Sequence, residues 1–510
     1  MRIHIKHKIT TFTLVSIKSF IAKQWASFVV NKIYKQHSNA LELQRVLLQL
    51  LVETAQNTAF GKAHQFSTIK DYEDFKAQVP IYDYEKIKAY IEQIKEGKEN
   101  ILWPGLPIYF AKTSGTTSGE KYIPITKDSI GHHIAAARNA LFHYIYETGR
   151  TKFIDGKMIF LQGSPVLEKI NTISVGRLSG IVYHHVPAYL HKNRKPSYET
   201  NCIEDWEEKV DQIVEETKQE DMRLISGIPP WLVMYFEKLI QHSNQKNVKD
   251  LFPNLSLIVY GGVNYQPYQN KIKQLLGATI DSIETYPASE GFIAYQDVQN
   301  KEGLLLNLDA YIFYEFIELD KYNKNKMERI SLADVKLDVN YVLLVTTNAG
   351  LWSYLIGDVV QFVSLKPYRI KVSGRTSQFI SAFGEHVIVE EIDSVMQQCI
   401  EHFQLSVNEF TVAPQINPTK GLPYHEWLIE WTNTPNNIAA IANYIDTKLQ
   451  EKNIYYKDLR SGNIIAEAKI TSLHQGAFNN YLSKIGKLGG QNKVARVRND
   501  RNVADQIMDN

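Results

Sequence analysis

Apolar residues recur at three- and four-residue spacing through the first hundred residues. The stretches ALELQRVLLQLLVETAQ and YEKIKAYIEQIKEG both carry this spacing, which predicts amphipathic helices over residues 1–100. The preceding stretch, MRIHIKHKITTFTLVSIKSFIAKQW, is basic and mildly apolar. Because no small-residue cleavage site follows its longest uncharged run, we interpret it as an amphipathic first helix packed on the body. A weak signal or a transit peptide is the alternative.

From Pro107 onward, short β-rich runs alternate with helical ones. We expect buried strands in KMIFLQG, RLISGIP, LSLIVYGG and ATIDSIETYP, and helices between them in PPWLVMYFEKLIQHS and YQPYQNKIKQLLG. Alternation of this kind predicts an α/β sheet. From about residue 303 the runs become successive strands, GLLLNLDAYIFYEFIEL, YVLLVTTNAG and SYLIGDVVQFVSL. These indicate an antiparallel sheet or a small barrel.

The pattern changes again after GRTSQFISAFGEHV. A helix, two strands, another helix and a further strand follow, enough for a compact α+β domain. We place a short hinge near residues 373–381. The prediction is an α/β protein with a large N-terminal domain over 1–376, built from helices, layered α/β sheets and a small barrel. A smaller α+β domain is expected over 377–510.

Composition narrows the functional classes. The 510 residues exceed the size of one growing core, so two or more domains are expected. With 57 basic and 55 acidic residues the net charge is +2, which gives no electrostatic reason to expect nucleic acid as a partner. Cys202 and Cys399 cannot form a disulfide framework, which favours a reducing compartment. No window reaches the roughly 18 apolar residues of a membrane span. We expect a cytoplasmic protein, and its oligomeric state stays open.

The most distinctive segment is SGTTSGE, residues 114–120, followed by Lys121. It combines two glycines, hydroxyl side chains and one acid, and we expect it to connect a strand to a helix. Such a loop presents backbone N–H groups and hydroxyls to an anion. The Walker pattern GxxxxGK[ST] and the hydrolase pattern GxSxG both fail to match. Phosphate binding is therefore the favoured interpretation, with a surface turn as the alternative.

Two later stretches add the other requirements of a nucleotide site. ETYPASEG supplies an aromatic, Tyr286, and an acid, Glu290, while YLIGDVVQF supplies Asp358 after a glycine. A nucleotide needs an aromatic face for its base, a carboxylate for its ribose hydroxyls and an acid for the Mg²⁺ on its phosphates. Each residue alone is weak evidence, because tyrosine in a strand is usually core and Asp after Gly is usually a turn. Their order behind the glycine-rich loop indicates an ATP site.

Taken together, TSGTTSGEKYIPIT, YPASEG and YLIGD resemble the three ATP-binding motifs of the adenylate-forming superfamily. The segment VPIYDYEKIKAYIEQIKEG and the late segment HQGAFNNYLSKIGKLGGQNKVARV resemble the auxin-responsive acyl-acid amido synthetases, the Gretchen Hagen family. The resemblance covers about residues 75–498. It implies ATP-dependent adenylation of a small carboxylic acid, followed by acyl transfer to the amine of an amino acid, with ATP and Mg²⁺ required.

The resemblance also implies roles for individual residues. The phosphates would be bound by the glycine-rich segment, at Ser114, Gly115, Thr116, Thr117, Ser118, Gly119 and Lys121. Adenine would lie between Tyr286 and the segment Gly261, Gly262 and Val263. Ser289 would lie by the α-phosphate, Glu290 would bind Mg²⁺ and take part in catalysis, Asp358 would accept from the ribose, and Arg375 would assist at the ribose or phosphate.

Lys493 resembles the catalytic lysine that the small domain brings in during adenylation. The family pattern continues Thr-Pro-Arg, whereas this chain has Val494, Ala495 and Arg496. A solvated basic tail is the alternative interpretation of this segment.

Two further functional alternatives stay open. An acyl-CoA synthetase would share the first half-reaction and use a thiol acceptor, and a catalytically silent homologue would keep only ATP affinity. The pairs His132–His133 and His184–His185 lack partners at metal-ligand spacing, so we interpret them as helix-surface and strand residues.

Overall fold

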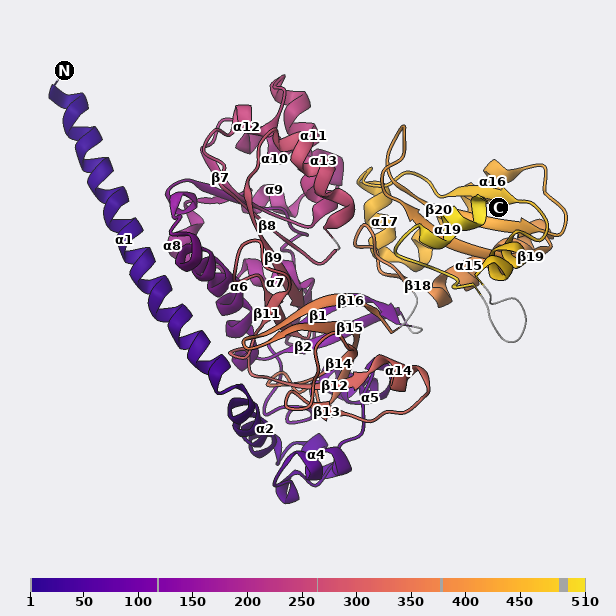
Figure 1. Cartoon of the computed structure of the whole chain (residues 1–510), viewed down its shortest axis with the longest axis horizontal. Coiled ribbons are helices and arrows are strands. Elements are labelled where there is room, and N and C mark those ends of the chain that lie inside the picture. Colours follow the sequence, from indigo (N-terminus) through magenta and orange to yellow (C-terminus); the bar gives the residue numbers. More distant parts are fainter. Residues whose placement is uncertain (1, 117–118, 264, 377–378, 486–493, 510) are drawn as a thin grey trace.

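The structure is a computed structural model that describes residues 2–116, 119–263, 265–376, 379–485 and 494–509. Helices at the N-terminus lead into a large mixed sheet with helices around it, and a smaller α+β unit follows (Figure 1). The predicted α/β class is confirmed.

The N-terminal segment is helical, as predicted. Its helices are α1 (Arg2–Ser38), α2 (Ala40–Ala55), α3 (Ala59–Ala63), α4 (Tyr72–Gln78) and α5 (Tyr84–Lys95), with a 3-10 turn η1 (Phe66–Thr68). Asp71 and Asp83 begin α4 and α5 as N-caps, each accepting a hydrogen bond from a backbone N–H of the first turn. The second half of α1 packs on the body, where Ala26, Val30 and Ile33 are buried.

One twelve-stranded sheet forms the centre of the molecule. Its order is β13-β12-β14-β15-β16-β11-β10-β9-β8-β7-β3-β6. The strands from β6 to β9 are parallel, and those from β9 to β13 are antiparallel. Their bounds are β3 (Lys157–Phe160), β6 (Arg194–Lys195), β7 (Met222–Ser226), β8 (Leu257–Gly261), β9 (Asp281–Ala288), β10 (Gly291–Tyr295), β11 (Leu304–Leu306), β12 (Ile312–Glu318), β13 (Ile330–Ser331), β14 (Asn340–Thr347), β15 (Tyr354–Leu365) and β16 (Tyr368–Arg375).

This pairing decides between the two arrangements expected after residue 303. Within the described part of the chain, the antiparallel strands continue the parallel ones in one open sheet. Of the two alternatives, the antiparallel sheet is therefore the one observed, and the expected small barrel is corrected. The physical reason is that β9 and β10 form a hairpin, which lets an antiparallel strand add directly to the edge of the parallel half. Sequence periodicity specifies strands but not their order.

Helices connect the parallel strands and cover the sheet. They are α6 (Lys127–Thr148), α7 (Leu178–Tyr183), α8 (Ala188–His191), α9 (Tyr198–Cys202), α10 (Trp206–Thr217), α11 (Pro229–Ser243), α12 (Val248–Leu251), α13 (Gln266–Leu276) and the later α14 (Leu319–Asn323), with a 3-10 turn η2 (Lys152–Asp155). The predicted helix at Pro229–Ser243 is confirmed, with proline at its first turn, where no intrahelical N–H bond is lost.

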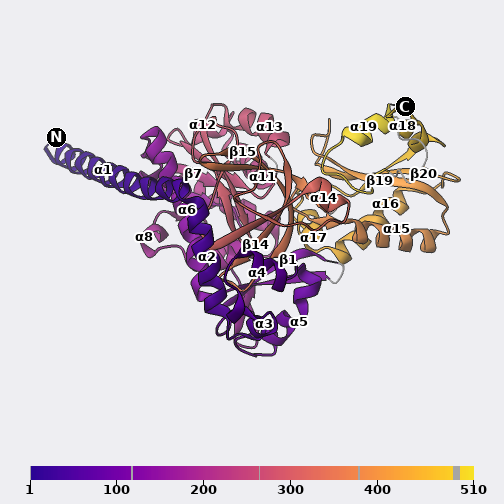
Figure 2. The same ribbon diagram turned by 60° about the horizontal axis from the view of Figure 1, so that its bottom comes forward.

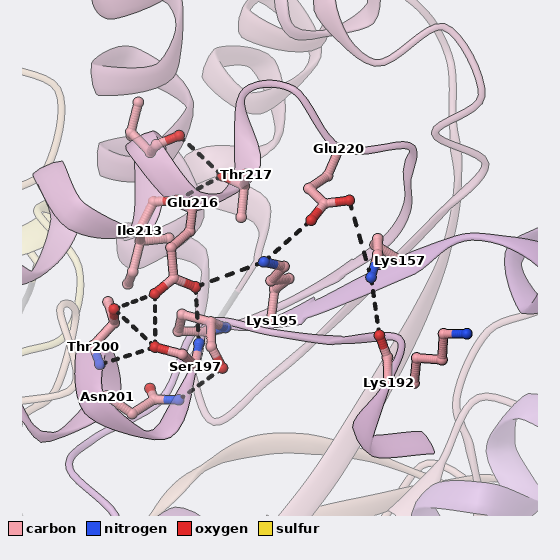
Figure 3. A network of polar contacts seen from close by, with 12 residues as sticks. Lys157, Lys192, Lys195, Ser197, Thr200, Asn201, Ile213, Glu216, Thr217 and Glu220 are labelled. Atoms are coloured by element: carbon pink, nitrogen blue, oxygen red, sulfur yellow. Dashed lines mark hydrogen bonds and ion pairs between the residues drawn. The ribbon is translucent and has the colours of Figure 1, made fainter. Parts of the chain in front are cut away.

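A polar network closes the β6 edge of the large sheet (Figure 3). The Glu216 carboxylate on α10 accepts hydrogen bonds from the Ser197 backbone N–H (2.9 Å), the Ser197 hydroxyl (2.7 Å) and the Thr200 hydroxyl. Burial raises the pKa of Glu216, but the hydrogen bonds from Thr200 and Ser197 outweigh it and bring the pKa below its ordinary value. Lys195 reaches Glu220 at 3.1 Å beside this cluster. The network holds the segment after β6 against α10.

A second sheet has the order β2-β1-β5-β4 and carries the glycine-rich segment. Its strands are β1 (Tyr109–Thr116), β2 (Gly119–Ile125), β4 (Glu168–Ile170) and β5 (Ile173–Gly176).

The C-terminal unit contains β17 (Phe379–Ile380), β18 (Val387–Ile388), α15 (Val389–Phe403), β19 (Val407–Gln415), β20 (Tyr424–Trp431), α16 (Ile438–Lys452), α17 (Ile454–Ser461), β21 (Lys469–Leu473), α18 (Ala477–Lys484) and α19 (Asn502–Met508). Strand β20 lies in the middle of a three-stranded sheet, antiparallel to β19 and parallel to β21. The predicted order of helices and strands is confirmed.

Several contacts between described residues join this unit to the preceding part of the chain. The Tyr455 hydroxyl donates to the Lys112 carbonyl (3.1 Å), the Tyr268 hydroxyl donates to the Ala382 carbonyl (2.5 Å), and Arg177 forms an ion pair with Asp458. The division into domains at 376 and 377 stays a prediction. Among the described residues, no helix combines the length and apolar character needed to cross a bilayer.

Candidate active site

Asp358 is the centre of a cluster of polar side chains on the antiparallel half of the large sheet. It is 4% exposed and lies directly opposite Arg375 in the β15–β16 ladder. The Arg375 guanidinium forms an ion pair with Asp358 Oδ1, and the Tyr286 hydroxyl donates to Oδ2. The strand register therefore brings together two residues that lie seventeen positions apart, because β15 and β16 are consecutive antiparallel strands.

Lys121 and Glu290 add a second pair of opposite charges. Burial lowers the pKa of Lys121, and among the nearby charges Glu290 opposes this most strongly, with Asp358 acting in the same direction. Burial raises the pKa of Glu290, and Lys121 is the charge that most strongly opposes that shift. Four of the predicted residues, Lys121, Glu290, Asp358 and Arg375, thus act on one another electrostatically. Their charges alternate in sign, which suits a site for phosphates and a cation.

The glycine-rich segment corrects one sequence-based expectation. We expected a loop between a strand and a helix, but β1 and β2 form a hairpin in which Thr116 pairs with Gly119, and α6 begins only at Lys127. The residues after Gly119, EKYIPI, are long enough and apolar enough to pair as a strand before the Thr126 N-cap starts the helix.

Phosphate binding by this segment stays a prediction. Thr117 and Ser118 lie outside the described residues, and for Ser114, Gly115, Thr116 and Gly119 the structure describes only the backbone. Lys121 is the third residue of β2, and its Nζ lies 5.9 Å from the centre of the Tyr84 ring.

Glu290 and Ser289 form the two-residue turn of the β9–β10 hairpin, because Ala288 pairs with Gly291. A carboxylate at a hairpin tip can approach a ligand without disturbing the ladder. Among the described residues, no group of three or more His, Cys, Asp and Glu side chains could hold a metal ion. Mg²⁺ is commonly bound through one or two carboxylates together with substrate phosphates. The single carboxylate of Glu290 therefore fits Mg²⁺ that arrives with ATP.

The segment predicted to line adenine follows β8. Gly261 is required by packing alone, since a Cβ at this position would lie 2.2 Å from the Thr285 carbonyl oxygen. Gly262 has φ +78°, a conformation that favours glycine. A Cβ built on Gly384 would lie 3.9 Å from Val263 Cγ2, so residues after the predicted hinge approach this segment. Tyr286 lies on the neighbouring strand β9.

His386 was missed by sequence reasoning. Its pKa is lowered to about 3 by burial and by the nearby charges of Arg375 and Lys121. Its Nδ1 lies 2.9 Å from the Ser381 hydroxyl, and its ring meets the Tyr455 ring edge to face at 6.2 Å. Both His386 and Ser381 come from the stretch SAFGEHV. The sequence pattern predicts a hinge at the start of this stretch, but it gives no sign that these two side chains lie near the site. The site thus receives side chains from both sides of the predicted hinge.

The paired histidines require two corrections. His133 is buried instead of lying on the helix surface, and it lines a small pocket together with Glu290 and Asn348. Burial lowers its pKa to about 4. His184 and His185 follow the end of α7 instead of lying in a strand. His185 Nε2 lies 2.9 Å from the Tyr109 hydroxyl. Lys493 lies outside the described residues, so its role stays a prediction.

Three family models match this chain. They are the GH3 family N-terminal domain over residues 29–185, the GH3 family central domain over 305–375 and the GH3 family C-terminal domain over 390–502. Together they span more than half of the chain. The central match ends at Arg375 and the C-terminal match begins at Glu390, on either side of the predicted domain boundary between 376 and 377.

Relatives with assigned names are distant but extend over most of the chain. A jasmonoyl–L-amino acid synthetase, GH3.5 from Oryza sativa subsp. japonica, is 21% identical and covers 93% of this chain and 95% of its own. An indole-3-acetic acid-amido synthetase, GH3.10 from Arabidopsis thaliana, is 22% identical and covers 83% of this chain and 85% of its own.

Solved structures show the same fold. The AtGH3.15 acyl acid amido synthetase in complex with 2,4-DB has a TM-score of 0.62 at 16% identity, covering 95% of this chain and 96% of its own. A 2-hydroxyisobutyryl-CoA ligase with 2-HIB-AMP and CoA has a TM-score of 0.56 at 14% identity, covering 92% of both chains.

Proposed function

We propose that this chain, which belongs to the GH3 family of the adenylate-forming superfamily, activates a small carboxylic acid with ATP. It then transfers the acyl group to the amine of an amino acid. The observation that carries the proposal is the cluster of Asp358, Arg375, Lys121 and Glu290. The names of the relatives, which are amido synthetases, agree with this activity.

The first half-reaction joins the acid to AMP. The substrate carboxylate attacks the α-phosphorus of ATP, the bond from that phosphorus to the bridging oxygen breaks, and pyrophosphate leaves. Lys121 is placed to interact with the phosphates, because it is a partly desolvated cation within the second strand of the glycine-rich hairpin. Partial desolvation strengthens its interaction with an anionic ligand. Arg375 adds a second positive charge beside Asp358.

Asp358 is proposed to hold the ribose. One of its oxygens interacts with Arg375 and the other accepts from Tyr286. A carboxylate offers about four lone-pair positions, so these partners leave capacity for ribose hydroxyls. Tyr286 is thereby held in place by its hydroxyl, which suits a ring that is proposed to stack on adenine.

Glu290 is proposed to hold Mg²⁺, with Ser289 beside it in the same turn. When bound, the cation would offset the negative charge that develops as pyrophosphate leaves. Lys493 is proposed to supply a further positive charge in this step only.

In the second half-reaction the amine attacks the acyl carbon, the bond to the AMP oxygen breaks, and an amide forms. The structures that share this fold include both an amido synthetase and a CoA ligase, so the fold does not choose the acceptor. We favour an amine because this chain belongs to the GH3 family. A thiol acceptor is the second candidate, and the identity of the acid is open. We also propose the domain division at 376 and 377, a mobile small domain and a cytoplasmic location.

Product analysis tests the proposal. Purified protein should exchange pyrophosphate into ATP only when a carboxylic acid from a broad panel is present, and it should release AMP. Mass spectrometry of reactions with amino acids or with coenzyme A should then find an amide and no thioester. Reactions without protein and reactions without ATP serve as the inactive controls. Release of ADP and phosphate, or no turnover with any acid, would contradict adenylation, whereas a thioester without an amide would contradict only the acceptor.

A further inference from the structure

The outward face of α1 carries large apolar side chains that are exposed to solvent. Ile17, Phe20, Ile21, Trp25 and Phe28 are 49, 63, 59, 56 and 66% exposed. A helix turns about 100° per residue, so these five positions lie on one side of α1. Ala26, Val30 and Ile33, which are buried, lie on the opposite side. Packing on the body therefore uses one face of this helix and leaves a second apolar face to solvent.

The same helix is strongly basic. Residues 1–41 contain seven Lys and Arg residues and no Asp or Glu, and the first acid is Glu42. The seven are Arg2, Lys6, Lys8, Lys18, Lys23, Lys32 and Lys35. This concentration contrasts with the chain as a whole, whose net charge is only +2. Lys18, Lys23, Lys32 and Lys35 are all exposed. Positive charge and exposed apolar area thus coincide on one element.

The N-terminal part of α1 also lies beside, not within, the catalytic fold. Both ribbon views show its N-terminal end projecting away from the rest of the chain (Figures 1 and 2). The match to the GH3 N-terminal domain begins at residue 29, after the exposed apolar side chains. The predicted ATP site is built from β2, β9, β15 and β16, so it does not account for this surface.

We propose that the outward face of α1 binds the surface of a lipid bilayer that contains anionic headgroups. The helix would lie in the plane of the interface, with Phe20, Ile21 and Trp25 in the headgroup and upper acyl region. Lys35, which lies on this face, and Lys18, which lies beside it, would contact the anionic headgroups. A helix with exposed apolar and aromatic side chains and an excess of lysine has the properties of such interfacial helices. Binding of this kind requires no span, in agreement with the absence of a bilayer-crossing helix among the described residues.

An anionic bilayer explains the observations better than a second copy of this chain. Two copies meeting through this face would bring two basic helices together without any acid on either to offset the repulsion. An anionic surface matches the lysines and also covers the apolar side chains. The proposed active site and the bilayer-binding face would then be separate surfaces of one molecule. Binding to the bilayer would keep the enzyme close to an acid substrate that partitions into membranes.

Co-sedimentation of the full chain with vesicles tests the proposal. Wild-type protein should bind vesicles of phosphatidylcholine mixed with phosphatidylglycerol, should bind phosphatidylcholine alone at least tenfold more weakly, and should be released by salt. The double variant Phe20→Ser/Trp25→Ser should lose about tenfold or more of the partition coefficient. The double variant Lys18→Glu/Lys35→Glu should lose a similar amount on anionic vesicles only.

Matched controls separate this surface from general effects. Val166 and Val372 are 55% and 49% exposed on other elements, and Val166→Ser/Val372→Ser should bind as wild type does. Every variant should keep the wild-type melting temperature, because each changed side chain is exposed. Wild-type fluorescence should change on vesicle binding, and Trp25→Phe should still bind but lack this change.

Four outcomes would overturn the proposal. They are no binding to anionic vesicles, equal binding to neutral vesicles without salt dependence, wild-type binding by the α1 variants, and a fluorescence change that persists in bound Trp25→Phe. A dimer that depends on α1 and forms without vesicle binding would assign the face to a second copy.

Discussion

Asp358 and Arg375 face each other across the β15–β16 ladder and form an ion pair at the edge of the predicted ATP site. Arg375 is the last residue of β16 and lies within the predicted hinge near residues 373–381. The carboxylate that is proposed to hold the ribose is therefore positioned by a residue that lies one position before the predicted end of the large domain. His386 follows that hinge in the sequence, and the charge of Arg375 contributes to lowering its pKa.

Asp358→Asn should weaken ATP binding. Hydrogen bonds to a charged group contribute about 1.5–3 kcal/mol, and the variant also leaves Arg375 without its charged partner. We expect the dissociation constant for ATP to rise about tenfold or more, measured by isothermal titration calorimetry. Tyr286→Phe removes only the hydroxyl that donates to Asp358 and should have a smaller effect. Unchanged ATP affinity in Asp358→Asn would place the ribose elsewhere.

Glu290→Gln should reduce turnover more than ATP binding. Removing the carboxylate removes the charged ligand proposed for Mg²⁺ while keeping the size of the side chain. We expect the exchange of pyrophosphate into ATP to fall on the order of a hundredfold at saturating ATP. The concentration of Mg²⁺ needed for half-maximal rate should rise. Wild-type rates with a wild-type Mg²⁺ dependence would exclude Glu290 as the metal ligand.

Lys493→Ala should separate the two half-reactions. If this lysine acts only while pyrophosphate leaves, the variant should form acyl-adenylate poorly yet transfer the acyl group from supplied acyl-adenylate at nearly the wild-type rate. Single-turnover assays of each step measure this split. Lys484→Ala changes another lysine of the same basic segment and should leave both steps intact. Equal loss of both steps in Lys493→Ala would contradict the predicted role.

Glu216→Ala should destabilise the fold without touching the predicted site. The side chain of Glu216 is 15% exposed, and its loss leaves the Ser197 and Thr200 donors without their acceptor (Figure 3). We expect the free energy of unfolding to fall by about 1–3 kcal/mol in urea titrations. The neighbouring Glu215, whose side chain is 50% exposed, provides the matched control, and Glu215→Ala should stay within about 0.5 kcal/mol. Equal effects of the two variants would show that the network adds no stability.

His37 should make stability depend on pH. Burial lowers its pKa to about 4, while Asp297 raises the value and His143 and Arg369 lower it further. Between that pKa and the ordinary value of about 6.5, the unfolded chain binds more protons at this residue than the folded protein. Its contribution is therefore full above about pH 6.5 and is lost as the pH falls toward 4. One such histidine costs on the order of 2 kcal/mol between pH 7 and pH 5.

His37→Phe should flatten this part of the pH profile of unfolding free energy, because the ring that must gain a proton is gone. His474→Phe, which changes an exposed histidine, should leave the profile unchanged. A His37→Phe profile with the wild-type slope would show that His37 does not carry the dependence.

The sequence by itself determined which elements form and which chemistry they support. Helices over Pro229–Ser243 and Val389–Phe403 could be predicted because apolar spacing and flanking strands agree locally, and the first of them also has proline in its first turn. Tyr286, Glu290 and Asp358 could be singled out because each follows a local pattern of strand and turn. The predicted family and α/β class are confirmed for the same reason, since motif order survives at about 20% identity.

Tertiary structure alone decided how distant segments meet. Pairing energies depend on neighbours far along the chain, so the sequence pattern could not show that the antiparallel strands extend the parallel sheet or that the glycine-rich segment lies in a hairpin. The same applies to burial. His133 and His386 have no local signal, and only the packing of α6 and of the segment after the hinge removes them from water and lowers their pKa values. The outward apolar face of α1 was equally hidden, because helical periodicity does not state which face the body will cover.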